Sequence, residues 1–152
     1  QFAWNLFNGE PLNLVDGGEA RRCFIDVEDA MDGLMAILRN EDGAADGRIF
    51  NIGNPANDLS VKEIAELMIG IWKDHPFRIE RGIAEGRMVE TSSGAFYGKG
   101  YQDVMRRTPS IRRMQEAFGF EPRIGMQAAL RKAMDFFVEE HMAMERVEET
   151  EG

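Results

Sequence analysis

The stretch LNLVDGGEARRCFIDVEDAM, residues 12–31, decides how the rest of the chain can be arranged. In it a short apolar run, Leu12–Val15, leads into Asp16-Gly17-Gly18, and a second run, Cys23-Phe24-Ile25, follows two arginines. Asp-Gly-Gly supplies the positive φ angles that a tight hairpin turn requires. We therefore predict that the two runs pair as a β-hairpin, with Arg21-Arg22 just past its turn.

The arginine pair beside this turn indicates a site for a diphosphate. A guanidinium is planar and binds phosphate oxygens in pairs, and the glycine-freed backbone amides nearby add further donors. The alternative is a solvated hairpin tip that carries two surface arginines. The residues of the hairpin leave both interpretations open.

Composition and charge narrow the class of protein. The chain has 152 residues, enough for one domain, and its 43% hydrophobic and 30% charged residues are typical of soluble globular proteins. No apolar run approaches the roughly 18 residues that span a bilayer, and we expect no signal peptide. The net charge of -9 argues against a nucleic-acid partner but permits a small anion held by a local basic cluster.

Cysteine usage indicates the compartment. Cys23 is the single cysteine, so the chain has no internal disulfide, as is typical of a reducing environment. We predict a cytoplasmic protein with no membrane partner. Because Cys23 lies in an expected strand, we interpret it as a small buried apolar residue and not as a nucleophile.

Further elements follow from periodicity, caps and breakers. We expect a helix over residues 1–7, one over 27–38 capped by Asp26 with an apolar face, one after the capping-box residues 60–63, one that opens at Thr108-Pro109 and ends at Phe118, and one over 126–141. Expected strands cover residues 48–52, 77–79 and 88–91, and the acidic residues from Glu139 onward are expected to fray. His75, beside a proline, has no metal-ligand spacing and is interpreted as structural or solvated.

Arg106 and Arg107 lie just before the expected helix that opens at Thr108. A helix N-terminus favours an anion and not two cations, so a bound anionic ligand would explain this placement. The alternative is a basic turn on an acidic protein. At the other end, Gln1 has no initiator methionine before it and falls inside an expected helix, so we expect a fragment, a processed product or an engineered segment of a longer protein.

Five segments, taken in order, resemble the C-terminal half of the extended short-chain dehydrogenase/reductases that act on nucleotide sugars: NLVDGGEARRCFIDVEDAMDGL, GRIFNIGNP, SVKEIAELM, YGKGYQDVMRRTPSI and GFEP. The fourth segment, with Arg107 in it, is the most specific. It is similar to the UDP-glucuronate dehydrogenase/decarboxylases found in bifunctional polymyxin-resistance proteins of the ArnA family, which serve aminoarabinose addition to lipid A. A looser form occurs in UDP-apiose/UDP-xylose synthases.

The resemblance implies an α/β fold: the C-terminal, substrate-binding part of an extended short-chain dehydrogenase, an incomplete Rossmann-type fold with short strands, a hairpin and four to five helices. It implies that residues 1–138 form this part, that residues 139–152 form a tail, and that the parent is a homo-oligomer. By the same resemblance Arg22 would meet the diphosphate, Tyr101 would contact the UDP moiety and Arg107 would be the catalytic arginine. The implied substrate-binding residues are Asn13, Leu14, Val15, Asp16, Gly17, Gly18, Glu19, Ala20, Arg21, Arg22 and Tyr101.

The implied chemistry is oxidation of the sugar C4 hydroxyl by NAD to a β-keto acid, followed by loss of the C5 carboxylate as carbon dioxide. The product would be a UDP-4-keto-pentose. Because an arginine side chain holds its proton too firmly to act as an acid at neutral pH, we expect Arg107 to orient the carboxylate or to stabilise enolate charge.

Two family features are absent from the sequence. No GxGxxG motif occurs, and neither tyrosine, Tyr97 or Tyr101, has a lysine four residues on. We therefore expect the NAD site in an N-terminal half outside this chain, no cofactor or metal site within it, and no catalysis by the chain alone. The alternatives are a UDP-xylose or UDP-apiose synthase, a nucleotide-sugar C4 epimerase, and a non-catalytic UDP-sugar-binding module.

Overall fold

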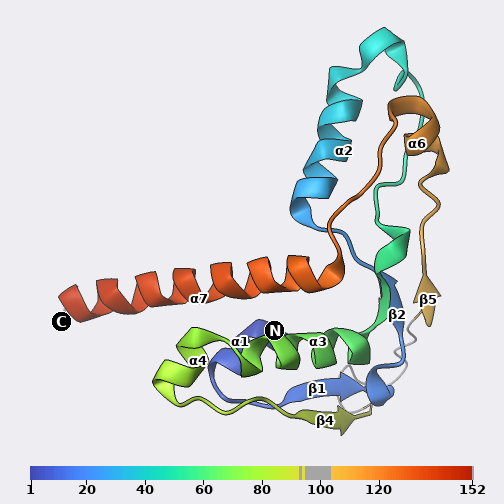
Figure 1. Ribbon diagram of the computed structural model, residues 1–152. Coiled ribbons are helices and arrows are strands. Elements are labelled where there is room, and N and C mark those ends of the chain that lie inside the picture. Colours follow the sequence, from blue (N-terminus) through green and yellow to red (C-terminus); the bar gives the residue numbers. More distant parts are fainter. Residues whose placement is uncertain (93, 95–103, 152) are drawn as a thin grey trace. The chain divides into compact units, whose positions relative to one another are not determined.

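The chain divides into two compact units. The computed structural model describes residues 1–92, 94 and 104–151 (Figure 1). Unit 1 comprises Gln1–Glu19, Val61–Gln102 and Leu130–Gly152, and unit 2 comprises Ala20–Ser60 and Asp103–Ala129. Each unit is thus assembled from segments that lie far apart in the sequence.

Unit 1 is a helical layer with a two-stranded parallel sheet. Its elements are α1 (Phe2–Phe7), β1 (Leu12–Val15), the single 3-10 turn η1 (Asp16–Gly18), α3 (Val61–Lys73), α4 (Pro76–Arg81), β4 (Met88–Thr91) and the part of α7 (Met126–Glu151) from residue 130 onward. β1 and β4 lie side by side, with Leu12 opposite Met88 (Figure 1). Leu6, Leu12 and Trp72 are fully buried, so this unit has a continuous apolar core.

The amphipathic pattern of α3 accounts for much of that core. Its apolar residues recur at helical spacing, and the side chains of Ile64, Met68, Ile71 and Trp72 are all buried. Burying side chains of this size stabilises a fold by roughly 1.5–3 kcal/mol each. The helix predicted after residue 60 is therefore confirmed.

Unit 2 is built on a three-stranded sheet in the order β3-β2-β5. It contains β2 (Arg21–Cys23), α2 (Val27–Arg39), the 3-10 turns η2 (Glu41–Gly43) and η3 (Pro55–Asn57), β3 (Asp58–Ser60), β5 (Arg106–Arg107) and α6 (Arg112–Phe118). β2 runs antiparallel to β3 and parallel to β5. Asp26 caps α2 as predicted, its side chain accepting a hydrogen bond from the Glu28 amide.

The predicted β-hairpin is wrong. Asp16, Gly17 and Gly18 do have positive φ angles of 47°, 74° and 71°, as the turn chemistry requires. The second strand is Arg21–Cys23 and not Cys23–Ile25, and the two strands join different sheets: β1 pairs with β4, and β2 pairs with β3 and β5. A Cβ on Gly18 would lie 3.0 Å from the Lys62 amide nitrogen, so this turn packs against the start of α3. Pairing with distant segments overrides the local hairpin signal.

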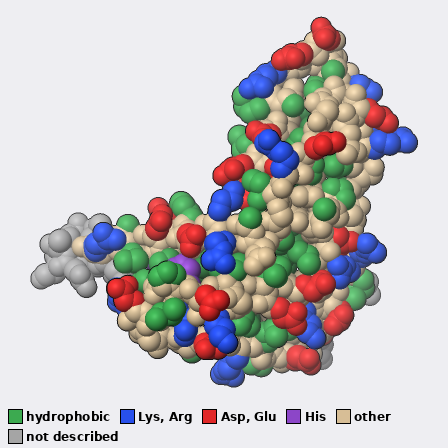
Figure 2. Space-filling model, viewed as in Figure 1, with side chains coloured by type: hydrophobic (Ala, Val, Ile, Leu, Met, Phe, Trp, Pro, Cys, Tyr) green, Lys and Arg blue, Asp and Glu red, His purple; other side chains and the backbone are tan. Residues whose placement is uncertain are grey.

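α2 has the predicted apolar face, but most of that face is exposed. Val27 is 70% exposed and Leu38 is 74% exposed, and Met31, Leu34 and Met35 on the same face are also exposed. The buried residues of the helix are Asp29 and Gly33. Figure 2 shows hydrophobic side chains at the surface over α2.

Buried Asp29 anchors a connecting loop in unit 2. Its carboxylate accepts hydrogen bonds from the backbone amides of Arg123 and Ile124, at 3.0 Å and 2.8 Å for one oxygen, and the side chain is 2% exposed. A buried carboxylate is stable only where hydrogen-bond donors satisfy it, and the two backbone amides do so here. This side of α2 is therefore held by polar contacts and not by apolar packing.

Several predicted boundaries also differ. Residues 77–79 belong to helix α4, which has proline at its first turn and Gly82 in the left-handed region at its end. Residues 48–52 form no strand, and α6 begins at Arg112 and not at Thr108. α7 continues as a helix to Glu151, through residues predicted to fray, in keeping with their strong helix formers. The described residues form six α-helices, where four to five were expected.

None of the helices in the described part of the chain combines the length and the apolar character that crossing a bilayer requires.

Candidate functional site

Two adjacent strands of unit 2 place four arginines in register. β2 and β5 run parallel, with Arg21 opposite Arg106 and Arg22 opposite Arg107. The sequence predicted that Arg106 and Arg107 lie just before a helix N-terminus. This prediction is wrong, because both residues lie in strand β5 and α6 begins at Arg112. The pairing joins two basic dipeptides that are more than eighty residues apart in the chain.

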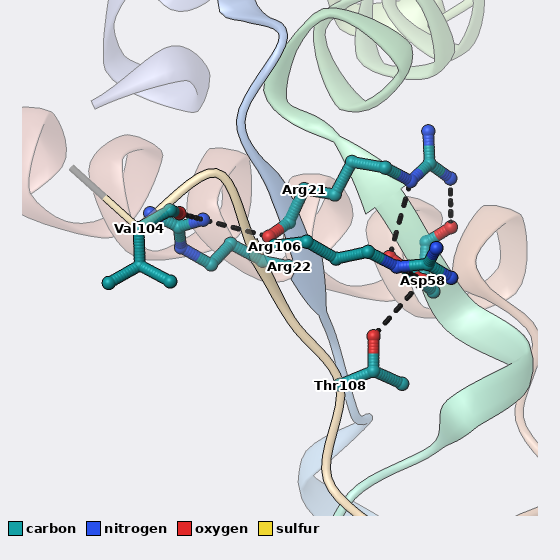
Figure 3. Close-up of polar contacts among 6 residues, drawn as sticks. All are labelled: Arg21, Arg22, Asp58, Val104, Arg106 and Thr108. Atoms are coloured by element: carbon teal, nitrogen blue, oxygen red, sulfur yellow. Dashed lines mark hydrogen bonds and ion pairs between the residues drawn. The ribbon is translucent and has the colours of Figure 1, made fainter.

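The carboxylate of Asp58 accepts hydrogen bonds from two of these arginines, Arg21 and Arg106. Its Oδ1 lies 3.3 Å from Arg21 Nε, and its Oδ2 lies 2.9 Å and 2.6 Å from Arg106 Nε and Nη2. Thr108 Oγ1 donates to the same Oδ2 at 3.1 Å, and Arg21 Nη2 donates to the Asp58 carbonyl oxygen (Figure 3). The Asp58 side chain is only 10% exposed, whereas that of Arg106 is 67% exposed, so these charge-assisted contacts lie at the surface of the unit.

These contacts set the charge state of Asp58. Burial by itself would raise the pKa of the carboxyl group. The hydrogen bonds from Arg106 and Thr108 and the positive charges of Arg106 and Arg21 together outweigh burial and hold the pKa of Asp58 below its usual value. Asp58 is therefore a stable anion at neutral pH.

Arg22 and Arg107 occupy the ladder position next to this pair. Successive residues of a strand point to opposite faces of a sheet, so Arg22 and Arg107 lie on the face opposite to Arg21, Arg106 and Asp58. Arg22 Nη1 donates to the carbonyl oxygens of Val104, at 2.6 Å, and of Arg21, at 2.7 Å. Within the residues that the structure describes, no hydrogen bond or ion pair is recorded for the Arg107 guanidinium, and the residue is exposed.

The other predicted substrate-binding residues fall in both units. Asn13, Leu14 and Val15 lie in β1, Asp16 to Gly18 form η1, and these residues belong with Glu19 to unit 1. Leu14 is buried, being 3% exposed. Ala20, Arg21 and Arg22 belong to unit 2, together with Arg107. Tyr101 lies outside the described residues.

Asp58 and Thr108 are functional candidates that the sequence did not reveal. Asp58 stands 37 residues from Arg21 and 48 residues from Arg106, and no local pattern links an aspartate to partners at such separations. Only the order of strands β3-β2-β5 brings them together.

His75 has the structural character expected of it, whereas Cys23 is only half-buried and not buried as predicted. Cys23 lies in β2, and burial raises the pKa of its thiol, which disfavours the reactive thiolate. His75 is buried in unit 1, where its Nε2 lies 3.1 Å from Asp135 Oδ1 and its ring stacks on Trp72. The sequence did not reveal Asp135 as the partner of His75.

Among the described residues, the turn at Asp16–Gly18 does not have the form of a dinucleotide site. Such a site needs a glycine-rich turn between a strand and a helix, whereas Asp16–Gly18 leads towards strand β2. Among the described residues, no group of three or more His, Cys, Asp or Glu side chains is arranged to hold a metal ion.

Comparison with known proteins finds one matching family model and several solved structures with a similar fold. Residues 1–53 match the model of the NAD dependent epimerase/dehydratase family. The fold is similar to that of PbgP3 protein from Burkholderia pseudomallei, with 34% sequence identity, a TM-score of 0.72, and coverage of 86% of this chain and 35% of that chain.

Two epimerase structures share the fold at lower identity. Epimerase Mth375 from Methanothermobacter thermautotrophicus has 21% identity and a TM-score of 0.74 over 95% of this chain and 38% of that chain. UDP-glucose 4-epimerase from Thermotoga maritima, solved with UDP-glucose, has 22% identity and a TM-score of 0.70 over 91% of this chain and 38% of that chain. The chain thus spans little more than a third of each solved structure. Its first 53 residues match the NAD dependent epimerase/dehydratase family, and its α/β fold is that of part of the epimerases in this superfamily.

Proposed function

We propose that this chain is the substrate-binding, C-terminal part of an NAD-dependent UDP-glucuronate oxidative decarboxylase. The observation that carries the proposal is the register of Arg22 opposite Arg107. Two arginines at opposite positions of a strand pair, on one face of a sheet, attract a ligand that bears more than one negative group. UDP-glucuronate has both a diphosphate and a carboxylate.

In this proposal each arginine has its own group on the ligand. Arg22 binds the diphosphate, and Arg107 orients the sugar carboxylate or stabilises the enolate that forms when carbon dioxide leaves. Tyr101 contacts the UDP moiety. The NAD that oxidises the C4 hydroxyl binds to an N-terminal half of the parent enzyme.

The charge distribution supports an anionic ligand of this kind. The chain carries a net charge of -9, yet the β2–β5 pair brings four arginines together, of which Arg21 and Arg106 contact an aspartate, Asp58. A local excess of positive charge on an acidic protein favours a small anion over a nucleic acid. The single cysteine agrees with a cytoplasmic enzyme, and we propose a homo-oligomeric parent that acts in aminoarabinose modification of lipid A.

The test is the reaction of the full-length gene product with UDP-glucuronate and NAD. We expect carbon dioxide together with net NADH. Carbon dioxide without net NADH would contradict an oxidative decarboxylase and indicate a UDP-xylose or UDP-apiose synthase. If neither carbon dioxide nor NADH is formed, the second candidate remains, which is a nucleotide-sugar C4 epimerase. The two epimerases that share the fold favour this candidate.

A non-catalytic binding module is distinguished on the 152-residue chain itself. Calorimetry with UDP, combined with urea unfolding, separates the cases. Tight UDP binding by a cooperatively folded chain, with no turnover by the full-length gene product, would favour the module.

Arg107→Ala tests the role given to this arginine. In the full-length gene product we expect decarboxylation to slow by about 100-fold or more, the usual effect of removing one group that stabilises transition-state charge. The affinity for UDP should stay within a few-fold, because UDP lacks the sugar carboxylate. Arg112→Ala, which removes an exposed guanidinium paired with Glu116, is the matched control. A large loss of UDP affinity in Arg107→Ala would show that Arg107 binds phosphate instead.

A further inference from the structure

Strand β5, which carries Arg107, is too short to hold itself on the sheet. It comprises only Arg106 and Arg107, and the Arg21 amide donates to the Met105 carbonyl at 2.7 Å just beside this pair. So few backbone bonds do not fix a strand in register on their own. Side-chain contacts must therefore supply the rest of the stabilisation that holds β5 on the sheet.

The β5 segment gains that support from Asp58. Arg106 contributes two hydrogen bonds and Thr108 a third, and all three end on Oδ2. Arg21, on the strand between them, donates to Oδ1 of the same carboxylate. One side chain of β3 therefore ties both β2 and β5 (Figure 3).

The same carboxylate also removes a repulsion. Arg21 and Arg106 are opposite each other in the ladder, and like charges directly opposite destabilise a sheet. The anionic Asp58 lies between their guanidiniums and turns this repulsion into two attractions. The register that places Arg21 opposite Arg106 also places Arg22 opposite Arg107.

We infer that Asp58 is a positioning residue, which fixes β5 on β2 and thereby holds Arg107 beside Arg22 on the opposite face of the sheet. The role in binding and catalysis rests on the proposed function; the role in strand register does not. Asp58 acts through Arg107 and touches no ligand.

Hydrogen exchange tests the register directly, without any ligand. In Asp58→Asn, which keeps the size of the side chain and removes its charge, we expect the Arg21 amide to exchange about tenfold faster or more, because its bond to Met105 opens. The Phe24 amide, bonded to the Asn57 carbonyl on the other side of β2, is the internal reference and should change much less. Equal acceleration of both amides would mean general loosening of the sheet and would overturn the inference.

Kinetics of the full-length gene product test the consequence. We expect Asp58→Asn to lower kcat for UDP-glucuronate about ten- to hundredfold, as a misplaced catalytic group does, with KM within about threefold. The double variant Asp58→Asn/Arg107→Ala should be no slower than Arg107→Ala alone, because residues that act as a unit are not additive. Asp58→Glu should restore part of the rate. Asp32→Asn, which breaks the exposed pair with Arg123, is the matched control.

The possible failures are distinct. If the full-length gene product does not act on UDP-glucuronate, the proposed function fails, and the amide exchange still decides whether Asp58 sets the register. If the enzyme is active and Asp58→Asn leaves both Arg21 exchange and kcat unchanged, the inference about Asp58 is wrong while the proposed function stands. Additive losses in the double variant would likewise overturn positioning through Arg107.

Discussion

Arg22 occupies a ladder position directly opposite another arginine, Arg107. In an isolated sheet two opposed guanidiniums repel, so this pair lowers the stability of unit 2 unless an anion lies near both. Arg22 donates hydrogen bonds to the carbonyl oxygens of Val104 and Arg21, which partly offsets this repulsion. The repulsion between Arg22 and Arg107 therefore lowers the stability of the free protein, and a bound anion would remove it. This agrees with the proposed site.

Arg22→Ala is expected to weaken UDP binding by roughly 1.5–3 kcal/mol, the value of a hydrogen bond to a charged group. Isothermal calorimetry with UDP measures this change. Arg123→Ala is the control, since it removes an arginine of the same unit that pairs with exposed Asp32. Unchanged UDP affinity in Arg22→Ala would mean that this arginine serves only the backbone carbonyls it contacts.

The lowered pKa of Asp58 predicts a pH dependence of stability. Because the folded-state pKa lies below the unfolded value of about 3.9, the carboxylate stabilises the fold fully above that value. This contribution is lost as the pH falls from about 4 through the lower, folded-state pKa. Arg21 on β2 and Arg106 on β5 are the charged groups that face it.

Urea titrations of wild type and Asp58→Asn, followed by circular dichroism at several pH values, check this expectation. The difference in unfolding free energy between the two proteins should be constant from about pH 5 to 7 and should shrink as the pH falls below about 4. A difference that grows on acidification would contradict the sign of the pKa shift.

At the scale of elements, a close approach between two connecting segments of unit 2 supports β5. A Cβ built on Gly53 would lie 2.7 Å from Cγ of Pro109, two residues after Arg107. Pro109 therefore packs against a glycine that has no side chain to displace it. This contact helps to explain why the residues after Arg107 continue as an extended segment and α6 begins only at Arg112.

Gly53→Ala is expected to destabilise unit 2 by about 1–3 kcal/mol, because the proline ring must shift to admit a methyl group. The change is measured by urea unfolding. Gly125→Ala is the control: nothing lies within 4 Å of its Cβ position, so its effect should stay within about 0.5 kcal/mol. Equal stability of the two variants would show that the segment around Pro109 adjusts freely.

At the scale of the whole molecule, the two units differ in how they are held together. Unit 1 buries large apolar side chains, including Leu6, Trp72 and Met134. Unit 2 buries few, and its α2 relies on Asp29 while its apolar face is exposed. Apolar burial is the main source of stability, so unit 2 is the weaker unit.

Native-state hydrogen exchange of the 152-residue chain tests this difference. Amides of α3 should exchange at least about tenfold more slowly than those of α2, equivalent to about 1.4 kcal/mol in opening free energy. Equal protection of the two helices would mean that the units unfold as one.

The sequence by itself determined the elements whose signals are local. The cap at Asp26, the apolar spacing of α3 and the positive φ angles of Asp16–Gly18 are all present as expected, because each depends on residues within one or two turns. The resemblance to sugar-nucleotide enzymes also selected the basic pairs around Arg22 and Arg107.

Only the tertiary structure decided which strands pair and which charges meet. The Asp16–Gly18 turn suited a hairpin, yet β1 found its partner in β4 and β2 found its partners in β3 and β5. Asp58 meets Arg21 and Arg106 across 37 and 48 residues. Strand pairing is set by burial and by hydrogen bonds between distant segments, and a local pattern contains no information about either.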